Sequence, residues 1–457
     1  METIANSSDD VLIDALSYKL GNSASYITDR KSVTFWPSGS NIYKTTSGTK
    51  VIKFQLNSEG WLDPSTVVIN FNLVNNDNTP YTPPSTDPNN PSVPQKYVRP
   101  LQGGHSFFRR LRISANGALI EDFDYNRTHQ MFEMLTSSHH RDNQAIEGFG
   151  YRSDSDPDPT FSHSVSSLTG IVSGSYQTVG FKLCSGLLNQ SKMLPLKYMG
   201  NLTIELELVN DANDPVVTPG VNTEFSTANT TNDWSIENVQ LKCDLVTIDN
   251  TLQNNYDSHL LNGGKLPVSY NTYVTQSQAV KGQDVSVNVS RAISRLKSVF
   301  VSFYKVPETP TPVEKEWLNF MHPMEYAAGH LYDKCYDLEF QLQIGAKLFP
   351  EYPIRSLSES FSQLKKAVGI LGSNFHSVSI SPKQYRMDHF LFGIDTEKAL
   401  GASYTGINTR SGDLLSVRVK AQDKSVLTET KMPDQMFVVL HSDCVLEIAD
   451  SGVSVFD

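Results

Sequence analysis

The sequence predicts an all-β protein made of two consecutive eight-stranded antiparallel jelly rolls, with a few short helices in the loops. Three observations support this fold class: apolar and polar residues alternate with period two, helical periodicity is confined to short segments, and one arrangement of strands and turns occurs twice. Short antiparallel strands joined by long loops fit a jelly roll better than an immunoglobulin-like sandwich, and no blade-length repeat indicates a propeller.

Alternation of apolar and polar residues is the dominant local pattern. The clearest runs are residues 51–56, 67–74, 202–208 and 285–289, where every second residue is Val, Ile, Leu or Phe. Such a strand presents one face to a core and the other to solvent or a partner. This favours antiparallel sheets, because parallel strands buried on both faces give continuous apolar runs.

Few helices are expected, and three segments have a helical pattern. Residues 354–368 carry an apolar stripe at helical spacing, and Ser356 and Glu359 have the spacing of a capping box at its start. A second helix is predicted around residues 125–135, and a third over residues 249–261, ending at Gly263 and Gly264.

The same order of strands, tight turn and helix occurs in both halves of the sequence. Residues 111–120 read as strand, tight turn and strand around Asn116-Gly117, the strongest short hairpin signal, and a predicted helix follows. Residues 340–349 repeat this around Gly345, again before a helix. Upstream, Gly48 precedes the strands at 51–56 and 67–74, as Gly282 precedes those at 285–289 and 297–304. We therefore expect eight strands in each half, with one helix in the loop after the sixth.

The predicted domains are an N-terminal arm over residues 1–30, a first jelly roll over 31–264 and a second over 265–457. Long polar loops at residues 75–100, 151–175, 210–233 and 306–316 separate the strands. Loops of this length are uncommon in compact domains and are usually functional, so we expect projections raised on a rigid scaffold.

Composition and charge exclude several functions. The 457 residues carry a net charge of −11, which argues against a surface that coats nucleic acid. No window approaches an apolar membrane span, and the acidic first ten residues do not form a secretory signal. The cysteines, Cys184, Cys243, Cys335 and Cys444, are scattered, so free thiols and a reducing compartment are expected rather than disulfides or zinc.

Two motifs suggest metal sites but do not meet the requirements. Asp154, Asp156 and Asp158 resemble the start of a calcium loop, but the Gly and the bidentate Glu that such a loop needs are missing. His139 and His140, with His129 nearby, lack a carboxylate at metal-site spacing. We expect surface loops at both places.

Two further motifs are interpreted as structural. Ser106 follows Gly104 but lacks the last glycine of a nucleophile elbow, so it is expected to start a strand. Arg109, Arg110 and Arg112 form the one tight basic run, and with Phe107 and Phe108 beside it such a run could bind nucleic acid. The structural interpretation is preferred: Arg110 and Arg112 share a face of a strand, and acidic neighbours across an oligomer interface are expected to pair with them. No catalytic, cofactor-binding or metal-binding residue is predicted.

Three segments carry a resemblance to a known family. Residues 111–122, residues 340–350 and residues 191–208 are similar to segments of the double jelly-roll major capsid proteins of adenoviruses, virophages, polinton-like viruses and large nucleocytoplasmic DNA viruses. The plan covers roughly residues 32–455, and its motifs are degenerate.

The resemblance implies a homotrimer whose six rolls make a pseudo-hexagonal capsomer of an icosahedral shell. It implies contacts between capsomers and with penton and minor or cement proteins, and it leaves an internal membrane open. It implies no enzyme activity, no cofactor and no sequence-specific nucleic acid, and a place in the virion, assembled inside the host cell and not secreted. Loops after the fourth and sixth strands, at residues 75–100, 306–334 and 125–175, would form outward towers.

Two questions stay open at this level. Leu12, Leu16 and Leu20 form an apolar stripe, which fits either an arm under the capsomer or a helix on its own roll or a frayed tail. The alternative function is a β-sandwich viral spike or a carbohydrate- or receptor-binding module, which would need a platform of aromatic residues. A cupin-like enzyme would need clustered His and Glu ligands. The internal repeat favours the capsid subunit, because one roll would suffice for the other two.

Overall fold

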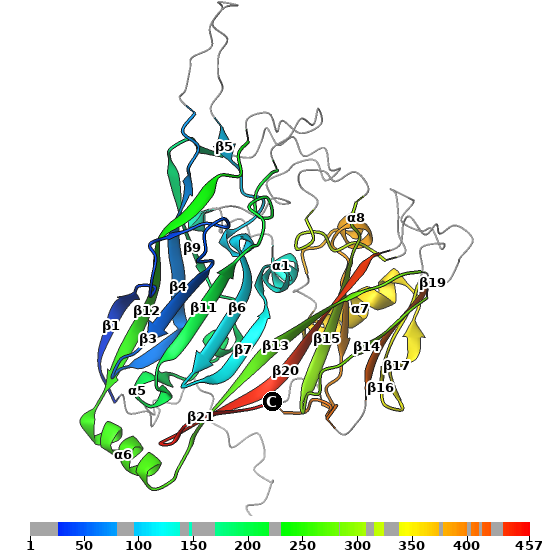
Figure 1. The fold of residues 1–457 in the computed structure, drawn as a ribbon. Coiled ribbons are helices and arrows are strands. Elements are labelled where there is room, and N and C mark those ends of the chain that lie inside the picture. The colour runs from blue at the N-terminus through cyan, green and yellow to red at the C-terminus, as the bar shows by residue number, and fades with distance from the viewer. Residues whose placement is uncertain are drawn as a thin grey trace, which may run out of the picture.

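Two β-sandwiches lie side by side in the structure (Figure 1). The computed structural model describes residues 26–79, 96–137, 146–148, 170–218, 230–282, 284–307, 315–323, 338–373, 378–399, 404–410, 414–421 and 433–457. The connection between the sandwiches is the helix α6 (Asn250–Leu261), which lies at their lower end (Figure 1).

The first sandwich has the strand order of a jelly roll. Its principal strands are β1 (Ile27–Phe35), β3 (Val51–Leu56), β4 (Trp61–Asn75), β6 (Phe108–Ala115), β7 (Ala118–Asp124), β9 (Tyr176–Lys182), β11 (Leu202–Leu208) and β12 (Trp234–Ile248). One sheet runs β1-β12-β4-β9 and the other β3-β11-β6-β7, and all these pairs are antiparallel. The shorter β2 (Ile42–Tyr43) and β10 (Leu194–Pro195) pair with β12 and β4, and β5 (Tyr97–Val98) pairs with β8 (Ile171–Val172).

The second sandwich repeats this order. Its strands are β13 (Leu266–Ala279), β14 (Asp284–Val289), β15 (Leu296–Tyr304), β16 (Leu338–Ile344), β17 (Lys347–Ile354), β18 (Phe392–Asp395), β19 (Leu415–Ala421) and β20 (Gln435–Ala449). The sheets run β13-β20-β15-β18 and β14-β19-β16-β17, and β21 (Gly452–Phe456) pairs with β20. The predicted fold class and the predicted duplication are therefore confirmed.

The hairpin signal is confirmed in its backbone geometry. Asn116 and Gly117 have φ of 48° and 81°, as the two-residue turn between β6 and β7 requires. Gly345, at the corresponding turn between β16 and β17, has φ of 60°. These two turns set the register of both hairpins.

The predicted helices are present, with small shifts at their ends. They are α1 (Tyr125–Leu135), α6 and α7 (Leu357–Ala367), and shorter helices are η3 (Gly104–Phe107), α4 (Gly186–Asn189), α5 (Leu196–Met199) and α8 (Pro382–Met387). The start of α7 was placed too early, because Ile354 is the last residue of β17. Ser356 caps α7 through the backbone NH of Glu359, whereas the Glu359 carboxylate accepts from the NH of Arg355, so the predicted capping box is half formed.

The predicted loop positions need one correction. Counted along the eight principal strands, α1 and α7 follow the fifth strand of each roll and not the sixth, and the loops beginning near residues 75 and 306 follow the third and not the fourth. Local alternation cannot separate a principal strand from a marginal pairing such as β2 or β5, so the strands were miscounted by one.

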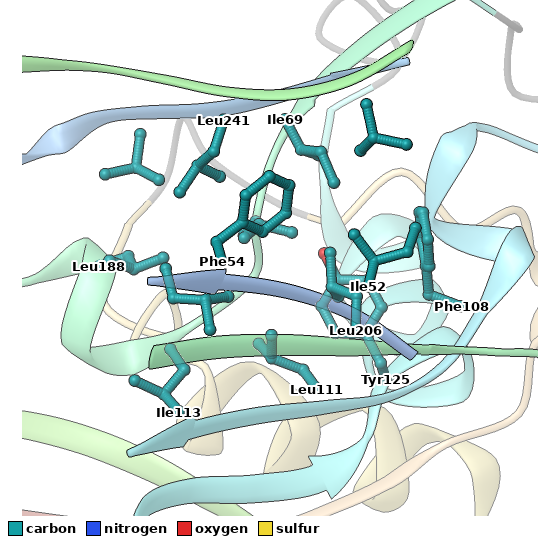
Figure 2. Close-up of a cluster of buried hydrophobic side chains, with 14 of the residues drawn as sticks. Ile52, Phe54, Ile69, Phe108, Leu111, Ile113, Tyr125, Leu188, Leu206 and Leu241 are labelled. Carbon is teal, nitrogen blue, oxygen red and sulfur yellow. The ribbon is translucent and has the colours of Figure 1, made fainter. Parts of the chain in front are cut away.

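The first core lies between the two sheets of its roll. Figure 2 shows Ile69 and Leu241 of one sheet facing Phe54 of the other, and all three are fully buried. Burying such a side chain contributes roughly 1.5–3 kcal/mol. In the second roll, the rings of Phe340 and Phe392 stack with centroids 3.8 Å apart. Each roll thus has a core of its own.

Candidate functional site

The helix α1 belongs to the first roll but packs into the second. Met131 and Met134 of α1 are buried in the apolar core of the second roll. The ring of Phe132 lies 4.9 Å from that of Tyr273 on β13 and 6.2 Å from that of Phe300 on β15, measured between centroids. β15 and β20 are consequently buried on nearly all residues, on both faces of their sheet.

Arg127 is the polar centre of this contact. Its buried guanidinium donates to the carbonyls of Glu316 and Asn319 (3.3 Å to the latter) and to Ser302 Oγ at 3.1 Å. The guanidinium carbon lies 3.9 Å from the ring centroid of Phe437. Burial lowers the pKa of Arg127 to about 9, so it stays protonated at neutral pH. One side chain of the first roll therefore holds three segments of the second.

A second contact joins the strand edges β7 and β13. Tyr270 OH donates to the carbonyl of Ile120 at 3.1 Å. The backbone NH of Asp124 donates to Thr275 Oγ1 at 3.0 Å, and the rings of Phe123 and Tyr273 pack edge to face with centroids 5.9 Å apart. Side chains, rather than a continued ladder of backbone bonds, cover the edge of β7.

Glu121 lies buried in the same contact. Its carboxylate accepts from Ser185 Oγ, from the NH of Gly186 at 2.9 Å and from Thr272 of the second roll. Gly186 approaches β13 so closely that an added Cβ would lie 1.4 Å from the carbonyl oxygen of Asn271. Burial raises the pKa of Glu121 to about 7, and these hydrogen bonds only partly counter it.

Loops beyond the sheets form a third contact. Trp317 Nε1 donates to the carbonyl of Asp214 at 3.0 Å, and Lys315 Nζ donates to Thr218 Oγ1 at 2.6 Å. Trp317 packs with Leu101 and Val217 of the first roll in a small apolar cluster. The rolls therefore touch at three places: α1 packs into the second roll, β7 packs against β13, and the loop at Trp317 packs on the first roll. These contacts join the two rolls into one unit.

The prediction that Arg110 pairs across an oligomer interface is wrong. Arg109 pairs with Glu207 at 2.8 Å, and Arg110 makes a two-pronged pair with Asp122. Arg112 lies opposite Asp122 and Glu205 in the strand register. These carboxylates belong to β11 and β7 of the same sheet, so Arg109 and Arg110 pair with cross-strand neighbours within the chain.

The histidine and serine motifs fall in different settings. Ser106 is buried in η3, two residues before the start of β6, and its hydroxyl donates to the carbonyl of Gly103, so it does not start the strand. His129 is on α1 and stacks on His105 with centroids 4.2 Å apart, a pair that the sequence did not indicate. His139, His140 and the predicted calcium-like Asp154, Asp156 and Asp158 lie outside the described residues.

The sequence also predicted free thiols, no metal site and no membrane-spanning segment. Among the described residues, no group of three or more His, Cys, Asp or Glu side chains is placed to hold a metal ion. Cys184, Cys243 and Cys444 are free thiols, and Cys335 lies outside the described part. None of the described helices combines the length and apolar character that crossing a bilayer requires.

Glu121 and Arg127, the two charged residues that organise the contact, had no signal in the sequence. Each lies among other charged residues of an ordinary strand or helix, and its partners are between about 60 and 190 positions away. The position of Arg127 on the apolar side of α1 is the one local signal. Its role becomes clear only from the second roll, where its partners lie.

The fold and the contact define a class: a chain of two jelly rolls of identical strand order, fixed side by side. Several solved structures share this fold. The chain is similar to PBCV-1 VP54 fitted into a reconstruction of the virophage Sputnik (TM-score 0.60, 11% identity, 96% of this chain and 99% of the other). It is also similar to the Faustovirus major capsid protein (TM-score 0.58, 9% identity, 95% and 93%) and to a chain of the Sputnik virophage (TM-score 0.56, 11% identity, 98% and 92%).

No protein-family model and no curated protein sequence matches the chain. The likeness is therefore one of fold, and it extends over nearly the whole length of each chain compared. The resemblance noted in the sequence is confirmed at this level.

Proposed function

We propose that this chain is a major capsid protein, three copies of which form a pseudo-hexagonal capsomer of an icosahedral virus shell. The observation that carries the proposal is the pair of like rolls held as one block by α1, Arg127 and Glu121. Three such blocks supply six similar units around one axis, which a lattice of hexagonal outline needs. The similarity of fold to viral capsid proteins supports the same function.

The charged groups of the contact support a structural role over a catalytic one. Arg127 is directed at backbone carbonyls and Glu121 at a backbone NH and two hydroxyls, so both are used to hold segments together. We propose that the chain is not an enzyme and uses no cofactor. The chain then divides into an arm (1–30), a first roll (31–264) and a second roll (265–457), with α6 next to the second boundary.

The further partners follow from the same role. They are other capsomers, penton proteins and minor or cement proteins, with a membrane under the shell left open. The place of the protein is the virion, with assembly inside the host cell. The free thiols at Cys184, Cys243 and Cys444 suit a reducing compartment of that kind.

The alternative binding module is less well supported. A sugar- or receptor-binding sandwich would present several aromatic rings together on one surface. Trp234 and Trp317 are only 3% and 4% exposed and serve in packing. Their burial leaves no such platform among the tryptophans that the structure describes, apart from the single exposed ring of Trp36.

Light scattering of the purified chain, followed by negative-stain imaging of the same peak, tests the proposal. A species of three chains, each 50.8 kDa, with hexagonal outlines is expected. A chain that remains monomeric at high concentration would contradict the proposal and favour the binding module.

A further inference from the structure

A cavity remains between the two rolls, beside the start of α1. Its volume is about 370 Å³, at the lower end of the ~300–1,000 Å³ typical of small-molecule sites. In the first roll its walls come from α1 and from the segment that follows β11. In the second roll they come from β13, β15, β20 and the segment that precedes Phe320. The cavity therefore exists only because the rolls are fixed side by side.

The cavity lies at the end of the molecule that carries the long loops. Figure 1 shows α1 between the rolls, well above the connecting helix α6. β7, β11 and β15 each lead into a segment that lines the cavity. The site is thus built where strands of both rolls end, away from the connection between them.

The lining changes from exposed to buried with depth. The exposed lining residues include Arg109, Asn210 and Ser277, and the buried ones include Met131 and Phe320. Exposed polar side chains form the rim, and apolar side chains contribute to the floor. A small molecule that enters from solvent would meet polar groups first and bury its apolar parts deepest.

Two buried polar atoms of α1 have no hydrogen-bond partner among the described residues. They are Nε of Arg127 and Oγ1 of Thr128, whose residues are 6% and 0% exposed. Both residues line the cavity. Buried polar groups in folded proteins are nearly always hydrogen bonded, so an unused donor and an unused hydroxyl at one cavity indicate a polar occupant.

Three carboxyl groups line the same cavity, those of Asp124, Asp214 and Glu316. The two arginines of the lining are engaged elsewhere. Arg109 pairs with Glu207, and Arg127 donates to backbone carbonyls and to a serine hydroxyl. The three carboxylates therefore remain as acceptors for the hydrogen bonds of an occupant.

Hydroxyl groups satisfy both sides of the cavity. A hydroxyl donates to a carboxylate and accepts from Arg127 Nε, whereas a cation would be repelled by Arg127 and an anion by the carboxylates. With three carboxylates against two arginines, the lining is nearly balanced in charge and suits a neutral ligand. The amides of Asn210 and Gln276 add donors and acceptors, and Met131 and Phe320 can pack against C–H groups.

We propose that this cavity binds a neutral sugar of one or two units, held through its hydroxyl groups. The inference goes beyond the capsid role and needs no second copy, because every lining residue belongs to one chain. It also differs from the flat aromatic surface of the alternative binding module, since polar groups of both rolls surround the ligand. A bound sugar bridges the rolls and stabilises their contact.

Saturation-transfer difference NMR on the full chain tests the proposal. The probes are glucose, galactose, mannose, fucose and N-acetylglucosamine, each at about 10 mM. At least one should bind with a Kd of about 0.1–10 mM, as expected for a small polar ligand. The methyl glycoside of that sugar separates two sources of the ligand: the end of a glycan chain binds as a glycoside, whereas a site for the free sugar rejects it.

Thr128→Val is the decisive variant. It removes one hydroxyl that has no partner among the described residues, so the urea midpoint should stay the same or rise. Sugar binding should weaken about 10-fold or more. Thr203→Val is the matched control, because Thr203 lies on the outer face of β11, and it should bind as the wild type does. Asp214→Asn, with Asp233→Asn as its control, replaces Thr128→Val if near-UV circular dichroism shows that variant to be misfolded.

The outcomes separate this inference from the proposed function. Sugar binding that Thr128→Val weakens and Thr203→Val preserves would support the site. No signal from any of the five sugars, or equal binding by the two threonine variants, would overturn it. Binding of putrescine or acetate in place of the sugars would overturn the ligand class. The number of associated chains is a separate measurement: a monomer that binds sugar would contradict the capsid function and leave this site standing.

Discussion

Replacing Glu121 with Gln should remove a pH dependence that the contact between the rolls imposes on stability. Glu121 is 2% exposed, and its pKa is raised from 4.5 to about 7, with burial the largest cause. The folded state therefore holds the proton more tightly than the unfolded state. The stability from this proton is fully present below pH 4.5 and is lost as the pH rises through 7.

The size of the effect follows from the two pKa values. A shift of one pKa unit corresponds to 1.36 kcal/mol, so the span from 4.5 to about 7 amounts to at most about 3 kcal/mol. Gln has nearly the same shape and stays neutral, so Glu121→Gln should match the wild type near pH 4.5. At pH 8 it should be more stable than the wild type by up to that amount.

Urea unfolding at pH 4.5 and pH 8 gives the change in the free energy of unfolding between the two pH values, and this change is compared between the wild type and Glu121→Gln. Other titrating groups cancel between wild type and variant, which isolates Glu121. Glu59→Gln, at an exposed position between β3 and β4, is the control and should follow the wild type at both pH values. Equal pH dependence of the wild type and Glu121→Gln would refute the assignment of a buried, proton-binding carboxyl between the rolls.

Three other changes test other parts of the structure. Arg127→Ala should lower the free energy of unfolding by about 3 kcal/mol or more, because it removes a buried charge that donates to several acceptors. The control Arg109→Ala, at an exposed ion pair, should lower it by at most about 1 kcal/mol. Equal urea midpoints of the two variants would contradict this. Gly117→Ala should cost about 1–2 kcal/mol because φ is 81° there, whereas Gly48→Ala, in open space, should cost less in thermal unfolding. Deleting residues 1–25 should leave the three-chain species intact but impair shell assembly, as seen in negative-stain images. Normal shells would disprove the role of the arm. The deletion stops at residue 25 because β1 starts at Ile27.

Local patterns predicted much of the fold. Alternation placed β3, β11 and β14 almost to the residue, because a half-buried strand needs a side chain on the core side at every second position. The turn at Asn116-Gly117 followed from the positive φ that few other residues accept. The duplication was visible for the same reason, since each roll uses the same strands and turns in the same order.

Local patterns failed where the environment came from a distant segment. Residues 297–304 were expected to form a strand, but their sequence did not show that β15 is buried on both faces, because α1 covers the outer one. Arg110 was assigned a partner in a neighbouring chain, although Asp122 on β7 of the same chain supplies it. A strand's own sequence does not state which strand lies beside it.

The sequence by itself determined the fold class, the duplication and the principal strands and helices, because these depend on side-chain periodicity and backbone preference over a few residues. The tertiary structure alone decided how the two rolls meet: that Arg127 and Glu121 face the second roll, and that a cavity remains between the rolls. Those features depend on contacts between residues far apart in the chain, and packing in three dimensions is what brings them together.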